Sequence, residues 1–378
     1  MKRVFIPILI CGINLFAYDM DYKYDFGGRL EYDIGQIETA DEKYNEFALR
    51  RARISHKGSF YGKSLFYELE VDLANFGDGN KENDEAEYKD NYIGHKNKVD
   101  YLDLSYRIKV GNIKVPFSFD SYAGSKNSTF MESPLTDTLT QNRKIGIETL
   151  FFKKDKNQRI NLFLGTFINS IDETNDGEEQ KTRYAIKTTY EYKFAKNHIF
   201  HFGASYLYSD IDGDNVKYSQ EAESNLIRDK YVSTKVKNVI ITKDSALEAL
   251  YINNSFHFQA EYIQSEVDAQ SDDYTFNGYY AQVGYFLFGS SKTYKQSSAN
   301  FSANKIIDNE VEIAFRYSFV DLNDKDEQGG TQKDYNFALN WYISKNLKLM
   351  ANYIQAYPLS DTYNGDFNLF QARTVISF

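Results

Sequence analysis

Seven basic side chains recur on one face of the extended segments of this sequence: Arg29, Arg51, Arg53, Arg107, Lys109, Arg316 and Arg373. Guanidinium and ammonium groups without partners attract anions, so a row of them guides ions along a surface. The alternative is structural, because opposite charges facing each other across strands stabilise a sheet. Carboxylates lie close by at Asp33, Glu68, Glu70 and Asp72. The sequence is compatible with both interpretations, and we favour ion guidance.

The segments that carry these charges have two chemically different faces. In residues 64–74, every second residue is apolar, and the residues between them are mostly acidic: Leu65, Tyr67, Leu69, Val71 and Leu73 alternate with Phe66, Glu68, Glu70 and Asp72. Successive side chains of a strand point to opposite sides. The apolar face of such a strand meets a second sheet in a soluble sandwich and lipid in a membrane barrel. The pattern recurs up to Phe378.

The N-terminus resembles an export signal. Lys2 and Arg3 precede an apolar run at 4–16, and Ala17 is a small residue at a plausible cleavage site. The run is too short for a membrane-spanning helix. We therefore expect a signal peptide at 1–17 and one domain at 18–378. That domain has no cysteine, because the single Cys11 lies in the signal.

The composition fits a membrane barrel better than a soluble protein. The chain has 32 Tyr and 29 Phe but only 4 Pro, which suits aromatic residues at a membrane interface and long uninterrupted strands. A mean hydropathy of −0.57 agrees with strands that face water on one side. The net charge of −10 argues against binding to nucleic acid.

The alternation predicts about sixteen strands, an even number that puts both ends of the barrel chain on the periplasmic side. A turn at Gly62-Lys63 would set Arg53 opposite Asp72 and Lys57 opposite Glu68. Alternation fades at 211–243 and 289–309, which leaves eighteen strands possible. The predicted strands are 22–37, 46–61, 64–74, 87–96, 101–113, 142–153, 158–170, 182–194, 198–210, 244–252, 255–268, 274–288, 310–321, 331–343, 347–357 and 366–378. We therefore predict an all-β fold, a transmembrane antiparallel β-barrel in the bacterial outer membrane.

Short motifs in a fixed order add a family resemblance. They are Arg-Arg-Ala-Arg-Ile at 50–54, Tyr-Glu-Leu-Glu-Val-Asp at 67–72, Lys-Asp-Asn-Tyr-Ile at 89–93, Val-Gly-Asn-Ile-Lys-Val-Pro-Phe-Ser at 110–118, Phe-Met-Glu-Ser at 130–133, Glu-Ala-Glu-Ser at 221–224, Gly-Tyr-Tyr-Ala-Gln at 278–282, Ala-Phe-Arg-Tyr-Ser at 314–318, Gly-Gly at 329–330 and Asn-Trp-Tyr-Ile at 340–343. In these motifs the chain resembles the phosphate-selective porin O and P family.

The resemblance implies a sixteen-stranded porin that assembles as a homotrimer among outer-membrane lipid and lipopolysaccharide. It implies that the third extracellular loop, here 114–141, folds inward as a constriction. It also implies that ions or phosphate permeate. The terminal Phe378 looks like the signal that barrel-assembly machinery reads.

The loop itself departs from a phosphate-binding pattern. Between 115 and 141 it has one basic residue, Lys126, against Asp120, Glu132 and Asp137, with Lys109 and Lys114 beside it. Phosphate capture needs several converging guanidinium or ammonium donors. We therefore predict a porin for passive diffusion of small hydrophilic solutes and ions, and a phosphate or anion channel as the second interpretation.

Two further classes of function compete with a channel. An outer-membrane enzyme needs a nucleophile and a base, yet none of the five histidines lies in a G-x-S-x-G context. A non-conducting surface barrel or adhesin would need a plug or large loops, and no segment of plug size stands out. We expect no enzymatic activity, cofactor or metal.

Overall fold

The computed structural model describes residues 21–39, 43–75, 86–125, 128–175, 180–227, 229–295, 299–361 and 363–378. The predicted signal peptide at 1–17 and the loop residue Lys126 lie outside the described residues. Within the described part of the chain, no helix is both long and apolar enough to cross a membrane.

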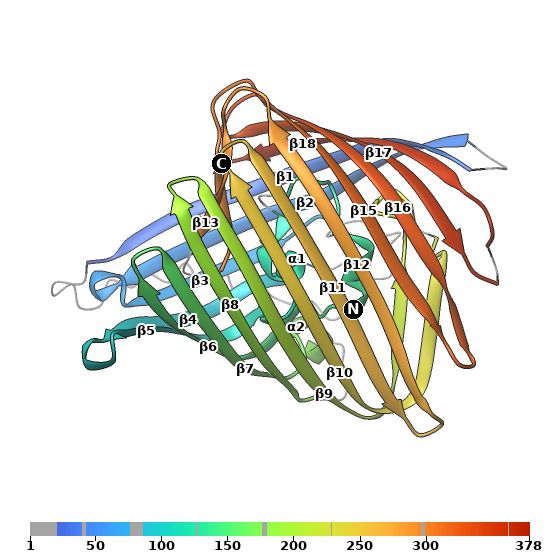
Figure 1. Cartoon of the computed structure of the whole chain (residues 1–378), viewed down its shortest axis with the longest axis horizontal. Helices are drawn as coiled ribbons and strands as arrows, with labels where there is room; N and C mark the ends of the chain where they lie inside the picture. The colour runs from blue at the N-terminus through green and yellow to red at the C-terminus, as the bar shows by residue number, and fades with distance from the viewer. Residues whose placement is uncertain are drawn as a thin grey trace, which may run out of the picture.

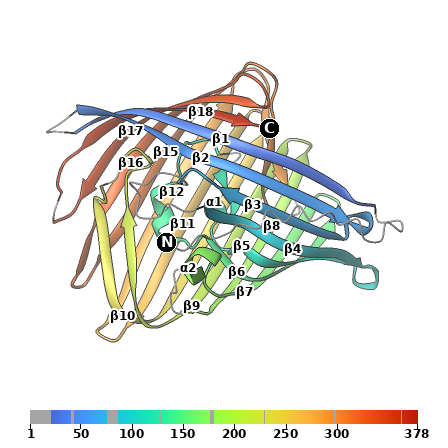
Figure 2. The ribbon, with the colours of Figure 1, turned by 180° about the vertical axis from the view of Figure 1, so that it is seen from behind.

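Sixteen antiparallel strands close into a barrel, as predicted, and its strands slant steeply around the ring (Figures 1 and 2). The strands of the ring are β1 (Lys23–Glu38), β2 (Lys43–Phe60), β3 (Leu65–Asp72), β4 (Glu87–Val99), β5 (Leu104–Lys114), β6 (Arg143–Asp155), β7 (Gln158–Phe167), β8 (Arg183–Ala195), β9 (His198–Gln220), β10 (Val232–Asn253), β11 (Phe256–Ala269), β12 (Asp273–Phe286), β15 (Glu310–Asp324), β16 (Glu327–Tyr342), β17 (Leu347–Leu359) and β18 (Phe367–Ser377). β1 pairs with β18 and closes the ring.

The remaining elements are short. α1 (Phe119–Ala123) and the 3₁₀ helix η4 (Leu135–Leu139) lie in the segment between β5 and β6, and α2 (Ile171–Asn175) follows β7. Two 3₁₀ turns, η1 (Tyr61–Lys63) and η2 (Asp100–Leu102), join neighbouring strands. β13 (Ser291–Lys295) and β14 (Asn300–Lys305) form a separate two-stranded sheet, so they do not extend the ring to eighteen.

The two faces of the wall divide as the alternation predicts. On β1, Glu31 and Asp33 are buried toward the interior, whereas Tyr32 and Ile34 are exposed on the outside. The large apolar side chains of the outer face would meet lipid in a membrane, and the polar side chains line the interior. Which set of alternate residues is apolar therefore shows which face of the strand points out of the barrel.

The predicted register between β2 and β3 is confirmed. Arg53 pairs with Asp72, and Lys57 pairs with Glu68. The chain reverses through η1, where Gly62 has a φ of +61°, a conformation that glycine adopts without steric cost. The turn thus sets which charges face each other.

A β-bulge changes the pattern of β2. Glu31 pairs with Arg51, but the next residue of β1, Tyr32, pairs with Leu49, so Arg50 is the additional residue in the bulge. A bulge re-aims the side chains beside it. Strict alternation would point Arg50 away from Arg51, yet both guanidiniums contact Glu132.

Strands β9 and β10 extend well beyond their predicted bounds into 211–243. At the start of β10 the wall pattern is reversed, with apolar side chains buried and charged side chains exposed. Val232 and Val236 are buried there, whereas Lys235 and Lys237 are exposed. Their apolar face packs with Tyr274 of β12 in one hydrophobic cluster. In this segment the apolar face points to other parts of the protein, so the wall pattern does not apply.

Candidate permeation site

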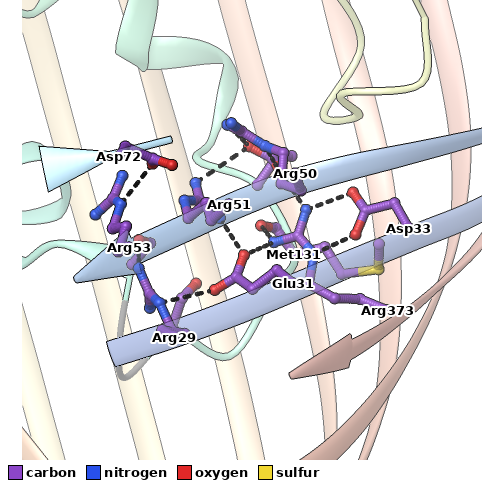
Figure 3. Close-up of polar contacts among 12 residues, drawn as sticks. Arg29, Glu31, Asp33, Arg50, Arg51, Arg53, Asp72, Met131 and Arg373 are labelled. Atoms are coloured by element: carbon purple, nitrogen blue, oxygen red, sulfur yellow. Dashed lines mark hydrogen bonds and ion pairs between the residues drawn. The ribbon is translucent and has the colours of Figure 1, made fainter. Parts of the chain in front are cut away.

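The arginines near the closure of the barrel converge on one carboxylate. Glu31 lies 3.1 Å from Arg29 Nε and 3.2 Å from Arg373 Nη1, and it accepts a hydrogen bond from Arg51 Nη1. Figure 3 shows Glu31 among Arg29, Arg51 and Arg373, with dashed lines marking these contacts. All four residues are less than a tenth exposed. In this cluster, positive and negative groups are interleaved rather than separated.

Arg373 and Arg50 extend this network to the segment between β5 and β6. Arg373 donates to both carboxylate oxygens of Asp33, at 2.6 and 2.7 Å, and to the carbonyl oxygen of Met131. Arg50 donates to both oxygens of Glu132 at 2.8 Å. Burial alone would raise the pKa of Glu132, but the charges of Arg50 and Arg373 hold it well below its usual range. Glu132 is therefore an anchor that stays ionised.

The other predicted arginines are also paired. Arg53 donates to Asp72 at 2.7 Å and lies 3.4 Å from Glu70. Arg107 donates to Glu148 at 2.9 Å, and Arg316 donates to Glu223. Two predicted lysines make contacts of another kind. Lys109 lies over the ring of Tyr92, and Lys114 donates to the carbonyl oxygen of Ser121 at 2.6 Å. The predicted carboxylate Glu68 is ion-paired with Lys57.

The segment between β5 and β6 bonds to strands around the ring. Ser118 and the backbone N–H of Phe119 donate to Glu261 of β11. Thr129 donates to Glu312 of β15 at 3.0 Å, and Thr138 donates to the carbonyl oxygen of Ser219 of β9. Together with the bonds from Arg50 and Arg373, these contacts tie the segment to widely separated parts of the wall.

A cavity of about 640 Å³ lies beside this segment. The predicted residues that line it are Arg51, Arg53, Asp72, Lys114, Asp120, Glu132 and Asp137. The predicted residues that do not line it are Arg29, Glu68, Glu70, Arg107, Lys109, Arg316 and Arg373. Charged lining residues that the sequence analysis missed are Arg50, Glu87, Lys89, Arg143, Glu221, Glu223 and Lys230. Sequence alternation did not reveal Arg50 because of the bulge. Glu223 is held by long-range hydrogen bonds from Arg316 and Asn336, and Glu221 pairs with Lys230 in the same loop.

Most charges around this cavity are compensated. Lys89 is paired with Glu87, Arg143 with Asp90, and Lys230 with Glu221. Two carboxylates differ. Among the described residues, neither Asp120 nor Asp137 has a basic nitrogen within 4.0 Å. No group of three or more described His, Cys, Asp or Glu side chains has the arrangement of a metal site.

Both loop aspartates have raised pKa values. Burial raises the pKa of Asp120, although Arg316 acts against the shift. The pKa of Asp137 rises to about 6, because it lies deep within the protein and because Asp120 repels its negative charge. Asp137 is nevertheless an exposed residue, because it lines the open cavity. Asp137 is thus the most exposed of the three acidic side chains in this segment.

The hairpin of β13 and β14, which the sequence analysis did not predict, packs against the interior. Tyr294 hydrogen-bonds His201 of β9, and Lys292 lies 3.7 Å from Glu312 of β15. The ring of Phe301 packs edge-on against Phe119 of α1 at 5.3 Å between centroids. Phe301 lines the first cavity, whereas residues 292–295 line a second cavity of about 460 Å³. The hairpin therefore borders both cavities.

A closed antiparallel barrel with an apolar outer face and a charged interior is the architecture of an outer-membrane channel. The chain belongs to the phosphate-selective porin O and P family, whose model matches residues 24–378. It is 24% identical to Porin O of Pseudomonas aeruginosa over 390 residues, which cover 91% of this chain and 85% of Porin O. This chain is a porin of the bacterial outer membrane.

Solved porins share the fold at low sequence identity. OmpF of Salmonella typhi matches 94% of this chain and 98% of its own, with a TM-score of 0.58 and 15% identity. An anion-selective porin from Comamonas acidovorans matches 95% of this chain and 100% of its own, with a TM-score of 0.55 and 10% identity. These structures confirm the barrel architecture.

Proposed function

We propose that this porin is a weakly selective channel for small hydrophilic solutes and ions rather than a dedicated phosphate channel. The observation that carries the proposal is the pairing of the interior arginines. A phosphate site needs guanidinium donors that are free to converge on the anion. Arg29, Arg51 and Arg373 instead share Glu31. Asp33 and Glu132 add two further carboxylates to this cluster, so its positive charge is largely cancelled where an ion would sense it.

We further infer that the predicted third loop, 114–141, is the constriction of the channel. Its bonds to β2, β9, β11, β15 and β18 support an inward course. The same proposal includes a homotrimer surrounded by lipid and lipopolysaccharide, and recognition of Phe378 by barrel-assembly machinery. Nothing in the site calls for enzymatic activity, and we propose none.

The test uses purified protein in planar bilayers and in proteoliposomes. We expect stepwise conductance, together with liposome swelling in small uncharged sugars that slows as the sugar becomes larger. Chloride current should be insensitive to low concentrations of phosphate. Absence of conductance would overturn the channel and favour a surface barrel, whereas strong phosphate block would overturn weak selectivity.

One observation favours the second candidate, an anion or phosphate channel. The cavity beside the hairpin is lined by five basic residues and one carboxylate, namely Arg159, Lys193, Lys196, Lys292, Lys295 and Glu191. A groove with one sign of charge concentrates counter-ions. If this cavity dominates permeation, phosphate block should disappear when Lys193 and Lys196 are both changed to Gln.

A further inference from the structure

Three residues that line the first cavity present hydrogen-bond acceptors. Two are the carboxylates of Asp120 and Asp137, which have no basic partner within 4.0 Å among the described residues. The third is Oε1 of Gln282 on β12. Gln282 is 5% exposed, and its Oε1 has no hydrogen-bond donor in the described part of the chain. An acceptor buried to this extent normally has a partner.

These acceptors are joined by a short chain of contacts. Gln282 donates from Nε2 to Oε1 of Gln259 at 3.1 Å, which leaves its own Oε1 as the unused acceptor. Gln259 in turn hydrogen-bonds the carboxylate of Asp120, as does Ser133. Asp120 and Asp137 are close enough to repel each other. The cluster therefore offers negative charge and acceptors but few donors.

We propose that Asp120, Asp137 and Gln282 form a binding site for the protonated primary amino groups of permeating solutes. An ammonium group has three N–H donors and no acceptor, so it complements a cluster of three acceptors. It also relieves the repulsion between two carboxylates in a confined volume. The inference rests on the proposed channel function and names the solute class that the constriction retains.

Neighbouring positive charges do not cancel this site. Arg316 acts on Asp120, but its guanidinium is held by Glu223 and by the carbonyl oxygen of Glu132. Lys114 acts on both aspartates and lies outside 4.0 Å of either carboxylate. We expect it to orient a zwitterionic solute, with the carboxylate of the solute toward Lys114 and the amino group toward Asp137.

The test compares two blockers of equal charge in single-channel recordings. 1,5-Diaminopentane carries N–H donors, and its bis-trimethylammonium analogue carries none. We expect the diamine to block the wild-type channel at a lower concentration than the analogue. In Asp137→Asn, the half-blocking concentration of the diamine should rise by at least about tenfold, as expected for a lost charged hydrogen bond. In Gln282→Leu it should rise by about fivefold.

Glu87→Gln is the matched control. It removes one negative charge from the same cavity, but Glu87 is already paired with Lys89, so block should change by less than about twofold. Equal block by the diamine and its analogue, or equal effects of Asp137→Asn and Glu87→Gln, would show a diffuse field and overturn the site. Channels that conduct without diamine block overturn this inference alone, whereas absence of channels overturns the proposed function as well.

A second measurement keeps the proposal testable if Asp137→Asn does not assemble. The wild-type channel is recorded one unit above and one unit below the pKa of Asp137, which is about 6. The charged groups that act on Asp137 are Asp120, Lys114 and Glu132. Since protonation removes the charge of Asp137, diamine block should weaken at the lower pH. Unchanged block would contradict the proposal.

Discussion

The wall of β1, β2 and β18 and the segment between β5 and β6 carry charge in contrasting ways. The wall holds three buried arginines, Arg29, Arg51 and Arg373, each of which contacts Glu31 or Asp33, and the partly buried Arg53 contacts Asp72. The segment has fewer charges, but Asp120 and Asp137 have no basic nitrogen within 4.0 Å among the described residues. We therefore infer that pairing, rather than the number of charged residues, determines which part of the interior an ion senses.

The largest effect should follow from breaking the wall at its centre. Glu31→Gln removes the carboxylate shared by Arg29, Arg51 and Arg373. Uncompensated buried charge is costly, so the free energy of unfolding in lipid vesicles should fall by about 3 to 5 kcal/mol. The guanidinium of Arg29, which contacts no other carboxylate within 4.0 Å among the described residues, should also shift the zero-current potential toward anions.

Glu38→Gln on the same strand is the control, because Glu38 and Lys43 are both about half exposed. Its cost should stay below about 1 kcal/mol. If the two variants unfold alike, the buried pairing does not stabilise the barrel.

A smaller effect should follow from Glu223→Gln. Glu223 lies between β9 and β10 and accepts hydrogen bonds from Arg316 and Asn336. Its neutralisation leaves Arg316 without its carboxylate, so anion permeability relative to cations should rise, by less than in Glu31→Gln. Glu221→Gln is the control, since Glu221 pairs with the partly exposed Lys230. Similar permeability ratios in both variants would show that Arg316 does not act on the permeating ion.

The charge of the segment between β5 and β6 can be varied with pH through Asp137. Asp137 is ionised above its pKa of about 6 and neutral below it. The cation preference of the wild-type channel should therefore decline as the pH falls through 6, and the zero-current potential of Asp137→Asn should be flat over the same range. A wild-type potential that is also flat would show that Asp137 does not contribute to selectivity.

The smallest effect should come from Lys57→Ala. Lys57 pairs with Glu68 across β2 and β3, but nearly half of its side chain is exposed. Such pairs contribute about 0 to 1 kcal/mol, so denaturant unfolding should change by no more than that. A larger loss would mean that this end of the wall depends on the pair.

The barrel was predictable because alternation is a local property of each strand. The predicted register of Arg53 with Asp72 followed from the turn and from the faces of two strands. The bulge at Arg50 was not predictable, because it breaks that alternation by one residue. The hairpin of β13 and β14 was missed because its side chains, such as Lys292 and Tyr294, pack inside the barrel and follow no wall pattern.

The candidate site was predictable only in part, for the same reason. Residues of the strands, such as Arg51 and Asp72, were assigned to the interior from their faces, and they line the cavity. Whether an arginine is paired depends on contacts between distant segments, as with Arg373 and Glu132. Glu223 and its partner Arg316 are brought together by a loop whose course the local pattern does not encode.

The central claim is that paired arginines leave the loop aspartates in control of selectivity. The most direct test is the zero-current potential of the wild-type channel in a KCl gradient at neutral pH, before and after phosphate is added. We predict a modest cation preference and no block of the current by low concentrations of phosphate. A strong anion preference with phosphate block would contradict the account, because it would mean that the arginines act on permeating ions despite their carboxylate partners.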